Sequence, residues 1–146
     1  MHTGWMSNAK SEYVFTVLAA ASRVEGRFNR VLSNVKGVSF TEYYLLKELN
    51  RCHNGSATRV ELANAVHLTP SAVTRALKPL EKIGYVRTQK GERDARQSIA
   101  TLTDAGNELL RDASKLINDE IDALPLGKDI GGSNLSALQT LALTRG

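Results

Sequence analysis

The chain has 146 residues, of which 42% are hydrophobic, and a net charge of +4 at pH 7. This length is typical of one domain with its own core, so we treat residues 1–146 as a single domain. No run of about 18 apolar residues predicts a membrane span, and the first residues lack the apolar core of a signal peptide; we therefore expect a soluble cytoplasmic protein. The single cysteine, Cys52, excludes an internal disulfide and a cysteine-based zinc cluster.

Charge is distributed unevenly along the chain. Between Arg51 and Thr101 there are nine Lys and Arg against four Asp and Glu, a charge of +5, so the total of +4 leaves −1 for the rest. A positive centre between near-neutral flanks is typical of a protein that contacts a polyanion. Charge alone leaves a solvated surface as an equally good interpretation.

Two helices are predicted in the first third of the chain. Residues 11–33 place apolar side chains at the spacing of an amphipathic helix, and residues 40–50 repeat that pattern before a turn at Asn54-Gly55. We expect three aromatic residues of the second helix in the core, with a pocket wall as the alternative: Phe40, Tyr43 and Tyr44.

A helix-turn-helix is predicted next. Thr58 and Glu61 form a capping box at the start of a short helix over about residues 59–66. Thr69 followed by Pro70 is a strong signal for the start of another helix, because proline at the first helical position loses no hydrogen bond. Two helices separated by about three residues are typical of this DNA-binding motif.

The helix that begins at Pro70 has two chemically different faces. A stripe to be buried consists of Val73, Leu77, Leu80 and Ile83. The free face starts with small hydroxyl residues and continues with cations: Ser71, Thr74, Arg75, Lys78 and Lys82. This chemistry suits a helix in the major groove of DNA, and we select Thr69, Ser71, Thr74, Arg75 and Lys78 as DNA-binding candidates. A plain exposed face is the alternative.

Pro79 lies inside this predicted helix. It removes the hydrogen bond to the Arg75 carbonyl, which costs about 3 kcal/mol in an ordinary helix. We expect a kink and not an end, because Leu80 and Ile83 continue the buried stripe. The kink either aims the first two turns at DNA or is simply tolerated.

Two short strands follow, over residues 85–89 and 97–102, and the charged loop between them makes a wing. A helix is expected from Thr103 or Asp104 to about Ala123, and a last one over about residues 133–143.

Several segments together resemble the multiple-antibiotic-resistance regulator (MarR) family. They are Leu-Thr-Pro-Ser-Ala-Val-Thr-Arg-Ala-Leu, Leu-Glu-Lys-Ile-Gly-Tyr-Val-Arg, the wing segment Arg-Asp-Ala-Arg, and Thr-Leu-Thr-Asp-Ala-Gly, all between about Val60 and Gly106. The resemblance implies a mainly α fold with a small antiparallel β-hairpin wing, in which residues 40–102 form the winged helix-turn-helix lobe. Residues 11–33 and 104–146 would form the helical dimerisation region.

The resemblance also implies a function. We expect a bacterial or archaeal transcriptional regulator that binds an inverted-repeat operator in double-stranded DNA as a homodimer. Such a regulator is usually a repressor released by a small phenolic or lipophilic effector, and no cofactor is expected. The family's wing motif matches Asp94 and Arg96, and its arginine would enter the minor groove. Asp94 could orient either Arg96 or Arg93 through an ion pair, and we rank Arg96 first.

Other chemistry is less well supported by the residues. Cys52 adjoins His53 but has no third catalytic partner, and it stands apart from the position of the family's redox-active cysteine. His2, His53 and His67 lack metal-ligand spacing. Arg23, Arg27 and Arg30 are expected on a solvated face, with an acidic effector as the alternative.

We expect no enzyme, because no phosphate-binding glycine loop, carboxylate pair or nucleophile–base spacing occurs. The alternative function is a winged-helix module that binds another protein and not DNA. Such a module would favour apolar residues where Ser71 and Thr74 stand.

Overall fold

The computed structural model describes residues 8–94, 96–128 and 130–144. His2 lies outside the described residues. Six α-helices, one short 3-10 helix and three strands follow in the order α1 (Ala9–Lys36), α2 (Phe40–Arg51), η1 (His53–Gly55), β1 (Ser56–Thr58), α3 (Arg59–Val66), α4 (Pro70–Ile83), β2 (Val86–Lys90), β3 (Ser98–Leu102), α5 (Asp104–Asp122) and α6 (Ser133–Ala142). The mainly α architecture with a small antiparallel sheet, expected from the sequence, is confirmed.

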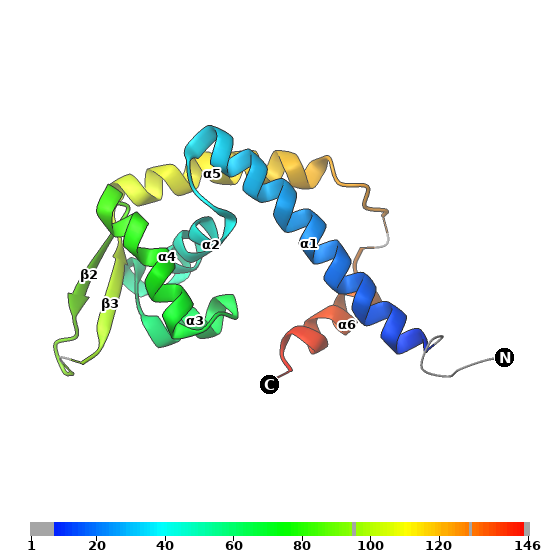
Figure 1. Cartoon of the computed structure of the whole chain (residues 1–146), viewed down its shortest axis with the longest axis horizontal. Helices are drawn as coiled ribbons and strands as arrows, with labels where there is room; N and C mark the ends of the chain where they lie inside the picture. Colours follow the sequence, from blue (N-terminus) through cyan, green and yellow to red (C-terminus); the bar gives the residue numbers. More distant parts are fainter. Residues whose placement is uncertain (1–7, 95, 129, 145–146) are drawn as a thin grey trace.

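The segments from α2 to β3 form a compact lobe, which we call the winged-helix lobe (Figure 1). Helix α2 lies in its middle and packs against α3, α4, α5 and β3. Its inward side chains are completely buried, as are one leucine of α1 and one of α4: Leu45, Leu46, Leu49, Leu32 and Leu80. The apolar periodicity of α2 therefore supplies three completely buried leucines to the lobe's core.

The sheet has three strands in the order β1-β3-β2, all antiparallel. Ala100 on the central strand faces Ala57 on one side and Thr88 on the other, and it is almost fully buried. The predicted two-stranded wing was thus incomplete, because Ser56–Thr58 adds an edge strand. The Ser56 and Thr101 hydroxyls, 2.8 Å apart, share a hydrogen bond across that pair.

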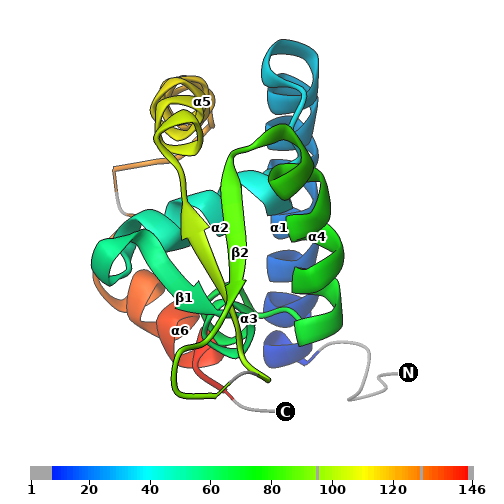
Figure 2. The same ribbon diagram turned by 90° about the vertical axis from the view of Figure 1, so that its left-hand side faces the viewer.

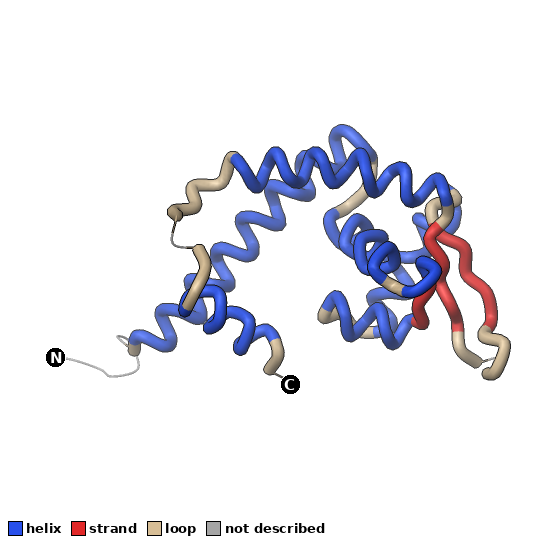
Figure 3. The backbone as a smooth tube through the Cα atoms, turned by 180° about the vertical axis from the view of Figure 1, so that it is seen from behind, coloured by secondary structure: helices blue, strands red, loops and turns tan. Residues whose placement is uncertain are grey.

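Helices α1 and α5 lie side by side above the lobe and extend away from it, and α6 lies below the N-terminal half of α1 (Figures 1 and 3). Two ion pairs join α1 to α5. The Arg27 guanidinium donates twice to Glu120, at 3.1 and 3.2 Å, and the Lys36 ammonium lies 3.4 Å from the Asp112 carboxylate.

The N-terminal half of α1 and all of α6 remain uncovered in the single chain. We call these two segments, residues 9–22 and 133–142, the open arms. Phe15 and Leu18 on α1 are 68% and 58% exposed, and α6 has no buried residue. The apolar spacing that predicted these helices therefore continues onto surfaces that the chain does not bury itself.

Candidate nucleic-acid interface

The turn between α3 and α4 is built by local capping. Thr58 accepts a hydrogen bond from the Glu61 amide while the Glu61 carboxylate accepts one from the Thr58 amide, so the predicted capping box is confirmed. His67 then adopts a left-handed conformation and closes α3. Thr69 caps α4 by accepting from the Ala72 amide at 3.1 Å. The capping box at Thr58, the left-handed His67 and the Thr69 cap together fix the direction in which α4 leaves the turn.

The two faces predicted for α4 are separated in the structure. Val73, Leu77 and Leu80 are buried against the lobe. The DNA-binding candidates Ser71, Arg75 and Lys78 are exposed, and Thr74 is half-buried with its hydroxyl donating to the Pro70 carbonyl at 3.0 Å. Thr74 therefore offers a methyl group and an oxygen acceptor to an incoming molecule, while its hydrogen remains within the helix.

As predicted, the helix does not end at Pro79, because α4 continues to Ile83. The prediction that Ile83 lies in the buried stripe was wrong, because its side chain is 58% exposed. Three residues correspond to 300° of rotation in a helix, so Ile83 stands about 60° from Leu80 around the axis. It reaches the edge of the buried stripe in the last turn, where Gly84 closes the helix.

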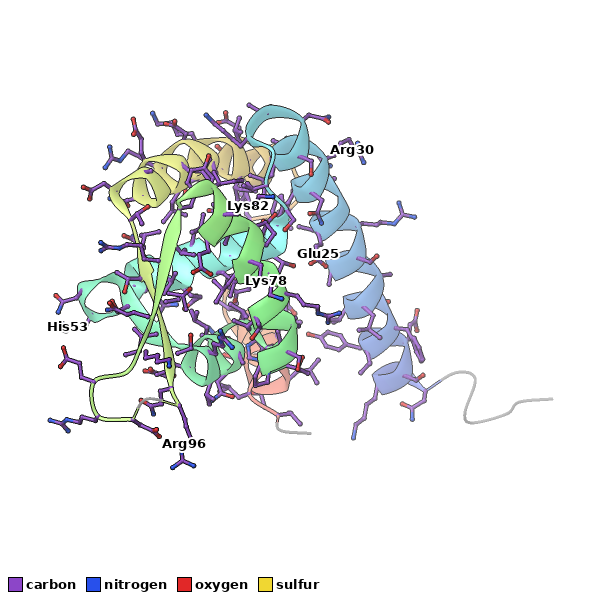
Figure 4. All side chains as sticks on the ribbon, turned by 60° about the vertical axis from the view of Figure 1, so that its left-hand side comes forward. Glu25, Arg30, His53, Lys78, Lys82 and Arg96 are labelled. Carbon is purple, nitrogen blue, oxygen red and sulfur yellow. The ribbon has the colours of Figure 1, made fainter. Side chains whose placement is uncertain are left out.

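The wing presents a defined pair of opposite charges. Asp94 accepts a hydrogen bond from the Arg96 amide at 3.0 Å, and its carboxylate lies 3.6 Å from the Arg96 Nε. The Arg96 side chain is 95% exposed and reaches outward from the wing in Figure 4. Arg93 is exposed on the same loop. Of the two arginines considered from the sequence, Arg96 is the one that the structure pairs with Asp94.

The first turn of α4 and the wing tip reach the same side of the lobe (Figures 1 and 2). Lys78 and Lys82 follow along α4 above that side, as Figure 4 shows. The structure thus combines a small polar helix start, cations farther along the helix and a cationic loop on one surface. That combination suits a DNA duplex, whose grooves and phosphates run side by side.

One joint connects this surface to α5. The Thr103 hydroxyl donates to the Gly84 carbonyl at 2.6 Å and accepts from the Gly106 amide at 3.0 Å, which caps α5. A Cβ atom at Gly106 would overlap the Tyr85 carbonyl oxygen. The end of α4, the start of β2 and the start of α5 therefore meet where only glycine fits.

Cys52 lacks the environment of a reactive thiol. Its Sγ donates to the Glu48 carbonyl at 3.2 Å. Burial, followed by the nearby Glu61 and Glu48 carboxylates, raises the pKa of the thiol above its ordinary value, and Arg51 opposes this only in part. A thiol with a raised pKa is a poor nucleophile at neutral pH.

Within residues 8–94, 96–128 and 130–144, no group of three or more His, Cys, Asp or Glu side chains is placed to hold a metal ion. In the same segments, no helix has the length and apolar character that crossing a membrane requires.

A pocket of about 260 Å³ lies between α1, α2 and the end of α3. Its lining residues are Ala21, Val24, Glu25, Phe28, Phe40, Thr41, Tyr44, Val66 and Leu68. Of the three aromatic residues weighed from the sequence, Tyr43 is buried in the core, whereas Phe40 and Tyr44 line the pocket. Sequence reasoning missed Glu25. The available signal was a charged residue among the apolar positions 21, 24 and 28 of one helix face.

The arginines of α1 do not line this pocket. Arg27 is engaged with Glu120, and Arg23 and Arg30 are exposed. The expectation that they lie on a solvated face therefore holds for Arg23 and Arg30.

Comparison with solved structures gives strong matches over most of the chain. Sco3205 from Streptomyces coelicolor, a MarR family transcriptional regulator solved in complex with DNA, is 28% identical with a TM-score of 0.83, covering 92% of this chain and 87% of that one. The transcriptional regulator BldR from Sulfolobus solfataricus is 24% identical with a TM-score of 0.82, covering 90% and 93%. CouR from Rhodococcus jostii RHA1, solved with p-coumaroyl-CoA, is 20% identical with a TM-score of 0.78, covering 96% and 99%.

Comparison with curated protein sequences gave no significant match. Residues 38–98, which contain the helix-turn-helix and most of the wing, match the model of the MarR family. Residues 38–98 thus match the MarR family model, and the chain as a whole shares the fold of MarR family transcriptional regulators.

Proposed function

We propose that the protein is a homodimeric, sequence-specific DNA-binding repressor that a small molecule releases from its operator. The observation that carries this proposal is the shared orientation of the first turn of α4 and the wing tip. Ser71, Thr74, Arg75 and Lys78 would enter the major groove, with the Thr69 end of the helix against the backbone. Arg96, oriented by Asp94, would enter the minor groove, and Arg93 would contact phosphate.

The open arms support a dimer. Apolar residues of α1 and α6 are exposed in the single chain, and contiguous exposed apolar surface typically marks an interface. A two-fold dimer would present two α4 helices to one face of DNA, so its operator would be an inverted repeat. Residues 11–33 and 104–146 would form the dimerisation region and residues 40–102 the DNA-binding lobe, in a protein that acts in the cytoplasm.

The pocket supports regulation by a small molecule. Val66 ends α3 and Leu68 lies in the turn before α4, while Ala21, Val24 and Phe28 belong to α1. A ligand between them would favour one separation of α1 from the helix-turn-helix. If that separation places the two α4 helices badly for DNA, ligand binding weakens operator binding by population shift.

The solved relatives agree with both parts of this proposal. Sco3205 was solved with DNA and CouR with p-coumaroyl-CoA. Each observation belongs to that protein, and we extend to this chain only the general scheme of a DNA-binding lobe with a ligand-responsive body.

The test is selection of bound duplexes from a randomised DNA pool by the purified protein, followed by sequencing. We expect enrichment of an inverted repeat with half-site centres about one helical turn apart. No enrichment and no retained DNA at low salt would reject the proposal and favour a winged-helix module that binds another protein.

A further inference from the structure

The pocket between α1, α2 and the end of α3 has an unusual balance of charge. Seven of its nine lining residues are apolar or aromatic, and Glu25 is the only one with a side chain charged at neutral pH. Among the residues that the structure describes, no Lys, Arg or His lines it. An anionic ligand would therefore find a negative charge and no positive partner in this pocket.

Glu25 is available for an ionic partner. Its side chain is exposed at the pocket and has no hydrogen bond or ion pair to any residue in the described part of the chain. Figure 4 shows Glu25 on the side of α1 that faces the lobe, whereas Arg30 is directed away from it. The neighbouring Arg27 is held by Glu120 on α5. The helix thus directs its free carboxylate, and none of its arginines, at the pocket.

Aromatic rings in the pocket also favour a positively charged ligand. Phe40 stands between Phe28 and Tyr44, with ring centroids 5.4 and 5.7 Å apart and the ring planes tilted by 35° and 45°. All three side chains line the pocket. Tilted rings present faces as well as edges, and the electron-rich face of an aromatic ring attracts a cation within about 6 Å.

From this combination we infer that the pocket selects a compact organic cation, in which a quaternary or protonated amine is attached to an aromatic or branched apolar group. The cationic group contacts the Glu25 carboxylate and an aromatic face, and the apolar group packs against Val24, Val66 and Leu68. This inference rests on the proposed function for its regulatory meaning. The family resemblance led us to expect a phenolic effector, and an acidic phenol carries a negative charge. The inferred ligand carries a positive charge instead.

Size and position make such a ligand effective. A volume of about 260 Å³ accommodates a single ring with a small substituent but not a large amphiphile. Because Leu68 lies directly before the Thr69 cap, the apolar end of the ligand would touch the turn that sets the direction of α4.

Calorimetric titration of the purified protein with three compact ligands tests the charge preference. Benzyltrimethylammonium is the cation, neopentylbenzene is its neutral isostere, and salicylate is the anion. We expect the order of affinity to be cation, neutral compound, anion. Glu25→Gln should weaken cation binding by about three- to tenfold and leave binding of the neutral compound unchanged. The reason is that glutamine keeps the size of the side chain but removes its partly solvated charge.

Two further variants locate the effect. Glu108→Gln makes the same change of net charge on an exposed residue of α5 outside the pocket, so it should leave all three affinities unchanged. Ala21→Phe fills the pocket from α1 and should abolish binding of the cation. Retention of the charge preference in Glu25→Gln, tighter binding of salicylate than of the cation, or no binding of any of the three ligands would overturn the inference.

DNA selection without ligand is a separate readout. Enrichment of an operator together with failed cation binding would reject the ligand class alone. Cation binding without operator enrichment would reject the proposed function and leave the charge preference of the pocket intact.

Discussion

The winged-helix lobe and the open arms are both helical and apolar in pattern, yet they differ in what their apolar residues touch. In the lobe Leu45, Leu46 and Leu49 have no exposed surface. In the arms Phe15 is 68% and Leu18 58% exposed, although their helical spacing is equally regular. Periodicity therefore shows which face a helix buries, and not whether its own chain or a second one covers that face.

This difference separates two sources of stability. The lobe's core is complete in one chain, so its free energy of unfolding should depend on local packing. In the proposed dimer the arms gain their burial through association, so their contribution to stability should depend on protein concentration.

Substitution of Phe15→Asp together with Leu138→Asp should abolish the dimer, because each places a charge on an apolar surface of an open arm. Operator affinity should fall by about 100-fold or more, since two half-sites would no longer be bound together. Light scattering and DNA titration measure the two effects. Val60→Asp changes an exposed apolar residue of the lobe and should leave the dimer mass unchanged. A dimeric double variant would place the interface elsewhere.

Leu46→Ala should lower the free energy of unfolding by about 2–5 kcal/mol, because it leaves a cavity in a fully buried site. Urea denaturation measures this cost, which should be the same at all protein concentrations at which the oligomeric state is constant. Leu18→Ala in the open arm is the comparison. Leu18→Ala should lower the free energy of unfolding only slightly once the chain is diluted to monomers. A loss as large as that of Leu46→Ala at high dilution would contradict the distinction between the lobe and the arms.

Gly106→Ala should destabilise the protein by about 1–3 kcal/mol, since its Cβ would collide with the Tyr85 carbonyl. Gly26→Ala is the matched control on α1, where a Cβ meets no atom within 4 Å. It should be neutral or stabilise by up to about 1 kcal/mol, because alanine favours a helix interior. Thermal unfolding of both variants measures this difference in stability. Equal effects would show that the close approach of Gly106 to Tyr85 is not important for stability.

Arg75→Ala should cost about 1–3 kcal/mol of operator binding and relax sequence preference, whereas Arg96→Ala should weaken specific and random duplexes more evenly. The reason is that Arg75 would contact base edges and Arg96 the minor groove, where the sequence code is more degenerate. Parallel titrations with operator and random DNA measure the difference. Equal losses on both duplexes for both variants would refute base recognition by Arg75.

Alkylation of Cys52 by iodoacetamide should be slower than that of free cysteine and should continue to rise with pH beyond the range where a free thiol levels off. The raised pKa keeps the folded thiol protonated to higher pH. The same profile is expected in the variant with both arms substituted, because Cys52 packs against the lobe's core. Alkylation faster than free cysteine at neutral pH would contradict the assigned environment.

The elements best predicted from sequence are those that local chemistry defines. The Thr58–Glu61 box and the Thr69-Pro70 pair gave the starts of α3 and α4 because hydroxyl caps and proline act within one turn. Strand β1 could not be predicted in the same way. Its three residues include only Ala57 buried, and its hydrogen bonds come from β3, more than forty residues later.

The candidate site divides similarly. Helical spacing correctly predicted that Ser71, Arg75 and Lys78 of α4 are exposed, whereas it did not show that Thr74 is half-buried and Ile83 exposed. The choice between Arg93 and Arg96 required the family motif, and the structure supplied the Asp94 contact. A pocket wall at Phe40 and Tyr44 was considered from the sequence as the alternative to a core position. The rest of the pocket could not be predicted, because α1, α2 and the turn before α4 contribute to it from distant parts of the sequence.

Because Thr103 ties the start of α5 to the end of α4, a small change in the orientation of α5 produces a larger displacement at its far end. The helix has 19 residues and so extends about 28 Å. If its start is fixed to the end of α4, a tilt of about 5° moves its far end by about 2.5 Å, which is the rise of nearly two residues along a helix. Because α5 and α4 both pack against α2, the lobe moves with α5 as one body, and a displacement of that size at the far end of α5 corresponds to a reorientation of α4 by the same small angle.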